Sequence, residues 1–218
     1  MRLFSLALAL AGVVGAAAPA ASAPIDITVN PIDGLDPNDG VRDVVGGQAV
    51  ILPEFDVEED AFRFLLSAFD EVGPPLNFVN ASADRLPASG VNTIVLQNAD
   101  DDNDLSTVFN AGSAANLIAG SVTEDTGGFF VYFNSALDIN RLVYSNDLSS
   151  TTSDLAILAA IESPTGQGAI DALPDFRNDN FAALAENVAP IPVPATLPLL
   201  GAALGGLGVL ARRSRRRA

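Results

Sequence analysis

The sequence predicts one α+β domain, residues 24–188, with antiparallel strands and several short helices. Three observations predict it: strand-type and helix-type segments are interspersed, they show no regular βαβ spacing, and no repeat of fixed period occurs. A β-sandwich with added helices is the alternative. Apolar residues make up 49% of the chain, which is enough for a core and is not typical of a disordered protein.

The most regular helical pattern begins near Asp56. Apolar residues recur at i, i+3, i+4 and i+7, the spacing of one buried helix face: Phe62, Leu65, Leu66 and Phe69. Asp56 and Glu59 form a D-x-x-E capping box at its start, and Gly73 followed by two prolines ends it. We therefore interpret the acidic residues 58–60 as helix-start residues rather than as ligands.

A second helix is predicted over 153–163, with Ser153 or Asp154 as its cap and Pro164 beyond its end. Its apolar face consists of Leu155, Ile157, Leu158 and Ile161. Weaker helical patterns cover 113–119 and 179–186.

Segment 128–145 predicts the strongest pair of strands. Residues 129–133 are apolar on both faces, and a short connection through Asp138 and Asn140 leads to residues 142–144, as in a β-hairpin. Tyr132 and Tyr144 are expected to pack in the core or across the strands. Further strands are predicted over 27–30, 47–53 and 91–100.

Charge is distributed unevenly along the chain. All eleven basic residues are Arg, and only five of them lie between the two ends, where they oppose all 27 Asp and Glu residues, a net charge of −22. The stretch between the two ends, called the body below, repels the phosphate groups of nucleic acids, so nucleic-acid binding is excluded. The chain has neither Cys nor His, which excludes disulfides, thiolate or imidazole metal sites and His-dependent catalytic triads.

The N-terminus has the three-part plan of a secretory signal peptide, residues 1–23. Arg2 precedes a short apolar run, residues 3–14, and small residues follow. An A-x-A pattern ends at Ala23, but Pro24 directly after it fits cleavage poorly. Cuts after Ala20 or Ser22 are the alternatives. A signal peptidase is the expected partner.

The C-terminal tail, residues 189–218, combines alternating prolines, an apolar segment and an arginine cluster. Residues 195–211 carry no charge and would span about 25 Å as a helix, which is marginal for a membrane. The arginines that follow predict a cytoplasmic end by the positive-inside rule: Arg212, Arg213, Arg215, Arg216 and Arg217. Both ends of the chain therefore place the body outside the cytoplasm.

The proline motif and its context resemble the VPLPA-CTERM sorting signal, a relative of the PEP-CTERM signals of Gram-negative bacteria. The motif consists of Ile191, Pro192, Val193, Pro194 and Ala195. The resemblance covers about 28 residues of the tail and none of the body. It implies recognition by an exosortase-type membrane transpeptidase and trimming of the tail. It also implies an inner-membrane anchor with the body in the periplasm, followed by delivery to the cell surface or an exopolysaccharide matrix. An ordinary uncut tail anchor is the alternative.

Two acidic segments could bind Ca²⁺ through oxygen ligands. The first is the run 100–104, with Asp100, Asp102 and Asp104; the second contains Asp36 and Asn38 in a D-x-N-x-G arrangement. The run at 100 is not an EF-hand, because it lacks the required Gly and Glu. The second segment is one residue short of the usual D-x-N-x-D-G loop. A solvated Asp/Asn turn is the interpretation that we favour for both segments, because these residue types suit turns.

The sequence favours an exported, non-catalytic protein of the cell surface or extracellular matrix. No nucleophile motif, phosphate loop or metal–His group is present, and no other cofactor is expected. A calcium- or carbohydrate-binding adhesion module is the first alternative, with exopolysaccharide as its partner. A secreted hydrolase that uses paired carboxylates is the second.

Overall fold

The computed structural model describes residues 24–35, 40–69, 71–104 and 106–185. The predicted signal peptide, the sorting tail, and the candidate ligands Asp36 and Asn38 lie outside these residues. Within the described residues, no helix has both the length and the apolarity needed to cross a membrane.

Seven strands form the larger sheet, in the order β2-β9-β8-β7-β6-β5, and β3 also pairs with β9. Their bounds are β2 (Val44–Val45), β3 (Val50–Leu52), β5 (Phe78–Ala81), β6 (Thr93–Leu96), β7 (Gly128–Asn134), β8 (Ile139–Ser145) and β9 (Leu155–Ile161). The hairpin β7–β8 and the pair β8–β9 are antiparallel. The other described pairs are parallel, so the predicted antiparallel arrangement holds only at the centre of the sheet.

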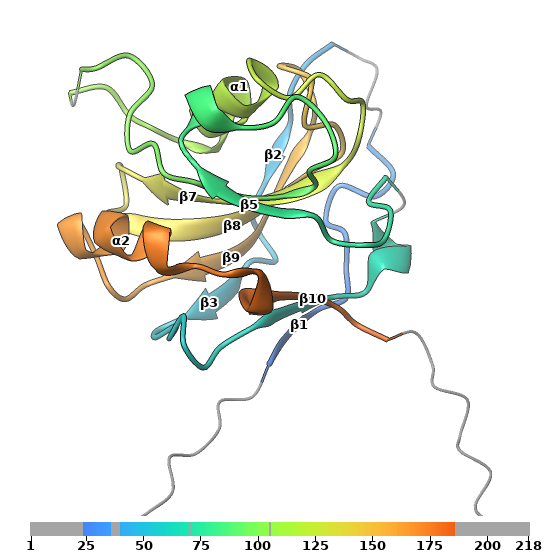
Figure 1. Ribbon diagram of the computed structural model, residues 1–218, viewed down its shortest axis with the longest axis horizontal. Coiled ribbons are helices and arrows are strands. Elements are labelled where there is room, and N and C mark those ends of the chain that lie inside the picture. The colour runs from blue at the N-terminus through green and yellow to red at the C-terminus, as the bar shows by residue number, and fades with distance from the viewer. Residues whose placement is uncertain (1–23, 36–39, 70, 105, 186–218) are drawn as a thin grey trace, which may run out of the picture.

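A smaller sheet joins the two ends of the described chain. It has the order β1-β4-β10, with β1 (Ile25–Ile27), β4 (Phe62–Phe64) and β10 (Phe181–Ala183). Both outer strands pair with β4 in parallel. The first and last strands therefore depend on the same central strand (Figure 1).

Among the described residues, helices are few and short. The longest is α1 (Ala111–Ala119), which begins where the side chain of Asn110 accepts hydrogen bonds from the amides of Gly112 and Ser113. It confirms the helix predicted at 113–119. The others are α2 (Gln167–Ala172) and four 3₁₀ turns, η1 (Leu66–Ala68), η2 (Ala83–Arg85), η3 (Leu173–Asp175) and η4 (Asn178–Asn180).

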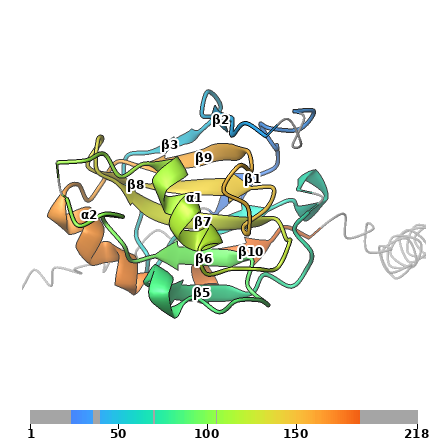
Figure 2. The same ribbon diagram turned by 90° about the horizontal axis from the view of Figure 1, so that it is seen from above.

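The larger sheet lies between two layers. Helix α1 covers one face, and the smaller sheet lies against the other (Figures 1 and 2). Residues of β7 alternate between the two sides: Phe129 packs in the core towards the smaller sheet, and Phe130 packs in the core under α1. The rings of Phe64 and Phe129 stack with centroids 3.9 Å apart and join the two sheets. The fold is thus a pair of mixed or parallel sheets with few helices.

The hairpin prediction is confirmed. Strands β7 and β8 pair over their whole length, from Gly128 opposite Ser145 to Asn134 opposite Ile139. All seven residues of β7 are buried, as expected for a strand covered on both faces. Tyr132 and Tyr144 are fully buried in the two cores, as predicted. The strands expected at 27–30, 47–53 and 91–100 correspond to β1, β3 and β6, although β1 begins and ends earlier than expected.

The helix predicted from Asp56 is wrong. The capping residues close a single turn, in which Asp56 accepts from the amide of Glu58 and Asp60 accepts from the amide of Asp56. The chain then becomes strand β4, because Phe62 and Phe64 alternate into the core between the sheets. Pairing with strands on both sides outweighs the local helical pattern.

The helix predicted over 153–163 is also wrong, because this segment is β9. All seven of its residues are buried, with β8 on one side and β2 and β3 on the other. A fully buried strand has apolar residues at every position, so it can match a helical spacing by chance. The weaker helix at 179–186 is wrong as well, since η4 and β10 occupy its described part.

Candidate functional site

The acidic run after β6 forms an exposed loop that gathers three carboxylates. Oxygen atoms of Asp100, Asp101 and Asp102 lie within 4.8 Å of one another, the one such group of three among the described residues. Of the predicted ligands, Asp100 and Asp102 are therefore brought together, and Asp104 is not part of the group. Asp101, which adjoins both predicted ligands, takes its place.

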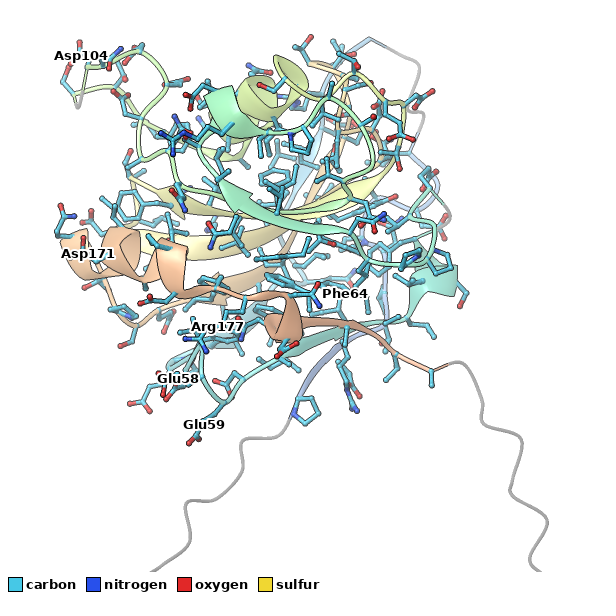
Figure 3. The ribbon with its side chains drawn as sticks, in the orientation of Figure 1. Glu58, Glu59, Phe64, Asp104, Asp171 and Arg177 are labelled. Carbon is cyan, nitrogen blue, oxygen red and sulfur yellow. The ribbon has the colours of Figure 1, made fainter. Side chains whose placement is uncertain are left out.

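Hydrogen bonds within this loop hold one oxygen of each predicted ligand. Oδ1 of Asp100 accepts from the amide of Asp101 at 2.8 Å, and Oδ1 of Asp102 accepts from the amide of Asp104 at 2.9 Å. The hydroxyl of Thr107 also donates to Oδ1 of Asp102, at 3.1 Å. These bonds fix the positions of the two Oδ1 atoms. The loop extends away from both sheets, with Asp104 at its far end (Figure 3).

Asp104 has a separate role in the loop. Its Oδ1 accepts from the hydroxyl of Ser106 at 2.7 Å and from the amide of Ser106 at 3.0 Å. These two hydrogen bonds, the hydroxyl first, lower the pKa of Asp104 below its ordinary value. The side chain therefore caps the turn rather than joining the carboxylate group.

A second candidate is an acidic cleft that the sequence did not predict. It consists of two hollows of about 450 and 440 Å³, which meet at Glu71 and Asn146 because both residues line both hollows. Asp33 lines the first hollow, and Asp125 and Asp147 line the second. No arginine is among the described residues that line either hollow. The cleft therefore has a negative potential and favours cationic or hydroxyl-rich ligands.

Glu71 is held in place from three directions. The buried hydroxyl of Tyr144 donates to its Oε2 at 2.6 Å, and the amide of Gly127 donates to its carbonyl oxygen at 3.1 Å. A Cβ atom at Gly127 would lie 2.7 Å from the Cβ of Glu71, so any larger residue there would displace the glutamate. Close packing and hydrogen bonds thus fix this wall of the cleft.

The topology explains why these residues meet. Asp125 precedes β7, and Asn146 and Asp147 follow β8, so the hairpin brings them to the same end of the sheet. The amide of Leu148 donates to the carbonyl of Thr126 at 2.8 Å and extends the pairing beyond the strands. The predicted hairpin could have indicated this pair of segments. Glu71 comes from a distant loop, and no sequence pattern indicates its position.

Very few of the carboxylates are paired with cations. Among the described residues the one ion pair joins Arg63 to Asp26, through bonds of 2.7 and 3.0 Å. Arg42 instead donates to the carbonyls of Gly112, Ser150 and Ser153. The acidic surface is therefore largely uncompensated by arginines of the described residues. Glu58 and Glu59 lie on the side of the molecule opposite Asp104 (Figure 3).

No family model, curated protein sequence or solved structure matches this chain.

Proposed function

We propose that this chain is an exported, non-catalytic protein of the Gram-negative cell surface or extracellular matrix. Its body acts as a stable anionic domain that accumulates cations at its surface. One observation carries this proposal. Of the five arginines among the described residues, only Arg63 forms an ion pair with a described carboxylate. The unpaired carboxylates need counterions from the medium, and a divalent cation can bridge such a surface to acidic polymer.

The destination rests on the two ends of the chain, which lie outside the described residues. The leader exports the body, and the tail with the motif 191–195 is recognised and trimmed by an exosortase-type transpeptidase. Replacing Pro192 and Pro194 together by alanine removes the two fixed φ angles by which proline favours an extended backbone. We expect this variant to accumulate with its tail in the inner-membrane fraction. Equal surface delivery of the variant and the parent chain would contradict recognition of the motif.

Calcium binding is the second candidate function, and the group of Asp100, Asp101 and Asp102 favours it. Their oxygens are already close together, and three carboxylates provide the hard oxygen ligands that Ca²⁺ prefers. A site with a Kd of about 1 mM, typical of extracellular modules, would stabilise the fold by about 1.4 kcal/mol at about 10 mM Ca²⁺. Carbohydrate binding has less support, because the buried Tyr144 is the one aromatic residue that lines the described cleft.

The test of this site is a Ca²⁺ titration followed by thermal unfolding at constant ionic strength. Asp102→Asn removes one charge and keeps an oxygen that can accept from Asp104 and Thr107. Glu59→Gln is the matched control, because it removes one exposed charge on the opposite side of the molecule. We expect Ca²⁺ to raise the Tm of the parent and of the control by roughly 3–6 °C, and not that of Asp102→Asn. Equal shifts in all three would exclude this site.

A further inference from the structure

An exposed apolar patch lies along one edge of the larger sheet. The described residues expose eight large apolar side chains, and four of them belong to β2, to β3 and to the segment after β1. These are Val29 (56% exposed), Val44 (53%), Val50 (37%) and Ile51 (55%). Val29 and Val50 line the same hollow, of about 160 Å³. Apolar side chains concentrated in this way mark a surface that binds another molecule.

This edge is open, unlike the opposite one. Strand β3 pairs with β9 on one side, and no described strand pairs with its other side. At the far edge, the side chain of Asn80 on β5 donates to the carbonyls of Leu173 and Phe176 and attaches η3 there. Figure 2 shows β2 and β3 along one border of the sheet and β5 at the other. An open edge presents main-chain donors and acceptors that an added strand can pair with.

Carboxylates lie at both ends of the patch. Asp43 directly precedes β2, and Glu54 and Glu162 follow β3 and β9 at the other end of the edge. All three side chains are exposed. The edge itself, residues 44–53, carries no charge. A partner therefore needs apolar residues in its middle and positive charge at its ends.

A second copy of this chain does not fit this requirement. Pairing two identical edges would bring Asp43, Glu54 and Glu162 of both copies into one interface, and like charges there oppose association. The chain has no Lys, and the guanidinium of Arg42 donates to the carbonyl groups of Ser153 and Gly112. The complementary charge has to come from a different molecule.

We propose that the β2–β3 edge binds an extended peptide segment of a partner protein, with apolar residues at alternate positions and Lys or Arg on both sides. The segment adds as a strand next to β3. Its main chain pairs with the open edge. Its apolar side chains share one face of the added strand and cover Ile51, whereas Val50, the preceding residue of β3, points to the opposite face. Its basic residues reach the carboxylates at the two ends. Because β3 has only three residues, this binding is weak and depends on the side-chain contacts.

The test measures binding of the synthetic peptide KVTVTVK to the full chain in non-ionic detergent by calorimetry. Ile51→Lys and Val44→Lys place a positive charge in the patch, and each should weaken binding by about tenfold or more. Leu137→Lys is the matched control, because Leu137 is 49% exposed on the β7–β8 turn and belongs to neither β2 nor β3. It should bind as the parent does. Far-ultraviolet circular dichroism and Tm verify that all variants are folded.

Two further peptides separate the contribution of the terminal charges from that of strand pairing. EVTVTVE reverses the terminal charges and should bind at least about tenfold more weakly, with the difference decreasing as NaCl rises from about 50 to about 500 mM. KVTPTVK breaks the strand and should not bind. The proposal is overturned if KVTVTVK fails to bind, if Leu137→Lys weakens binding as much as Ile51→Lys, or if the two charged peptides bind equally. Dimerisation of the parent that Ile51→Lys abolishes would assign the edge to a second copy and overturn it as well.

Discussion

The hydroxyl of Tyr144 donates a hydrogen bond to Oε2 of Glu71 across 2.6 Å and joins the central sheet to the wall of the acidic cleft. We predict that Tyr144→Phe lowers the free energy of unfolding by about 1 kcal/mol, because the exposed carboxylate of Glu71 regains water while the buried donor is lost. Urea unfolding measures this change.

A double-mutant cycle with Glu71→Ala checks that the effect belongs to this pair. We expect a coupling energy of about 1 kcal/mol between Tyr144 and Glu71. Strictly additive effects of the two substitutions would mean that the bond contributes nothing to stability.

Arg42 connects the start of β2 to two other segments. Its guanidinium donates to the carbonyl of Gly112 and the side chain of Asn116 in α1, and to the carbonyls of Ser150 and Ser153. Burial lowers the pKa of Arg42, and Asp154 partly offsets this. Lys cannot reproduce the planar fork, so Arg42→Lys should destabilise the fold by about 2 kcal/mol. Chemical denaturation measures the loss, and a loss no greater than that of Arg85→Lys would contradict this role.

The small sheet depends on its last strand. Phe181 on β10 is 4% exposed, and its ring centroid lies 6.1 Å from that of Phe62 and 5.6 Å from that of Phe78. Phe181→Ala should therefore cost about 3–5 kcal/mol in stability. Leu137→Ala, on an exposed turn, should change stability by less than about 0.5 kcal/mol. A small loss for Phe181→Ala in urea unfolding would show that β10 is dispensable.

We predict that the free energy of unfolding falls in alkali because of the buried Tyr132. Burial raises the pKa of Tyr132, with hydrogen bonds from Asn134 and Arg141 opposing the shift. The unfolded chain loses this proton from about pH 10, whereas the folded chain keeps it, so stability is complete below pH ~10 and falls as the pH rises towards the folded pKa. The slope should approach about 1.4 kcal/mol per pH unit.

Tyr132→Phe should reduce this slope. The chain contains no Lys or Cys, and Arg keeps its proton at this pH, so few other groups titrate in the same range. Stability measured by urea unfolding from pH 9 to 11 provides the comparison. Identical slopes for Tyr132→Phe and the parent chain would contradict the assignment.

The unpaired acidic surface predicts that salt stabilises the fold. Repulsion among carboxylates is screened as ionic strength rises, because the Debye length falls from about 10 Å at 0.1 M to about 3 Å at 1 M. We expect the Tm to rise continuously with NaCl over this range. The single described ion pair, Arg63–Asp26, is exposed, so its loss by screening should be small in comparison. A Tm that falls with salt would mean that ion pairs, rather than repulsion, dominate the surface.

The sequence predicts the centre of the fold correctly and fails at strands that match a helical spacing. The β7–β8 hairpin is identified by its aromatic and β-branched residues, and α1 by its local pattern. β9 has the sequence LAILAAI, in which Leu and Ala favour helix, and only burial between β8 and β2–β3 makes it a strand. For β4, pairing with the two terminal strands decides the structure, and those strands are distant in sequence.

The two candidate sites also differ in how far the sequence predicts them. The group of Asp100 and Asp102 is local, so the acidic run itself indicates it. The acidic cleft requires Glu71 to meet Asn146 and Asp147, and this contact exists only after the strands have paired. Spacing along the chain carries no information on such a contact.

The most direct test of the central claim is the intact mass of the protein recovered from the native cell surface. Export followed by sorting predicts a chain that begins between residues 21 and 24 and lacks residues 196–218, so that all five terminal arginines are absent. The acidic body should remain whole through residue 185, because β10 ends at Ala183 and the amide of Leu184 still pairs with Phe64. A surface-recovered mass that still includes residues 196–218 would contradict sorting by tail removal and leave a simple membrane anchor.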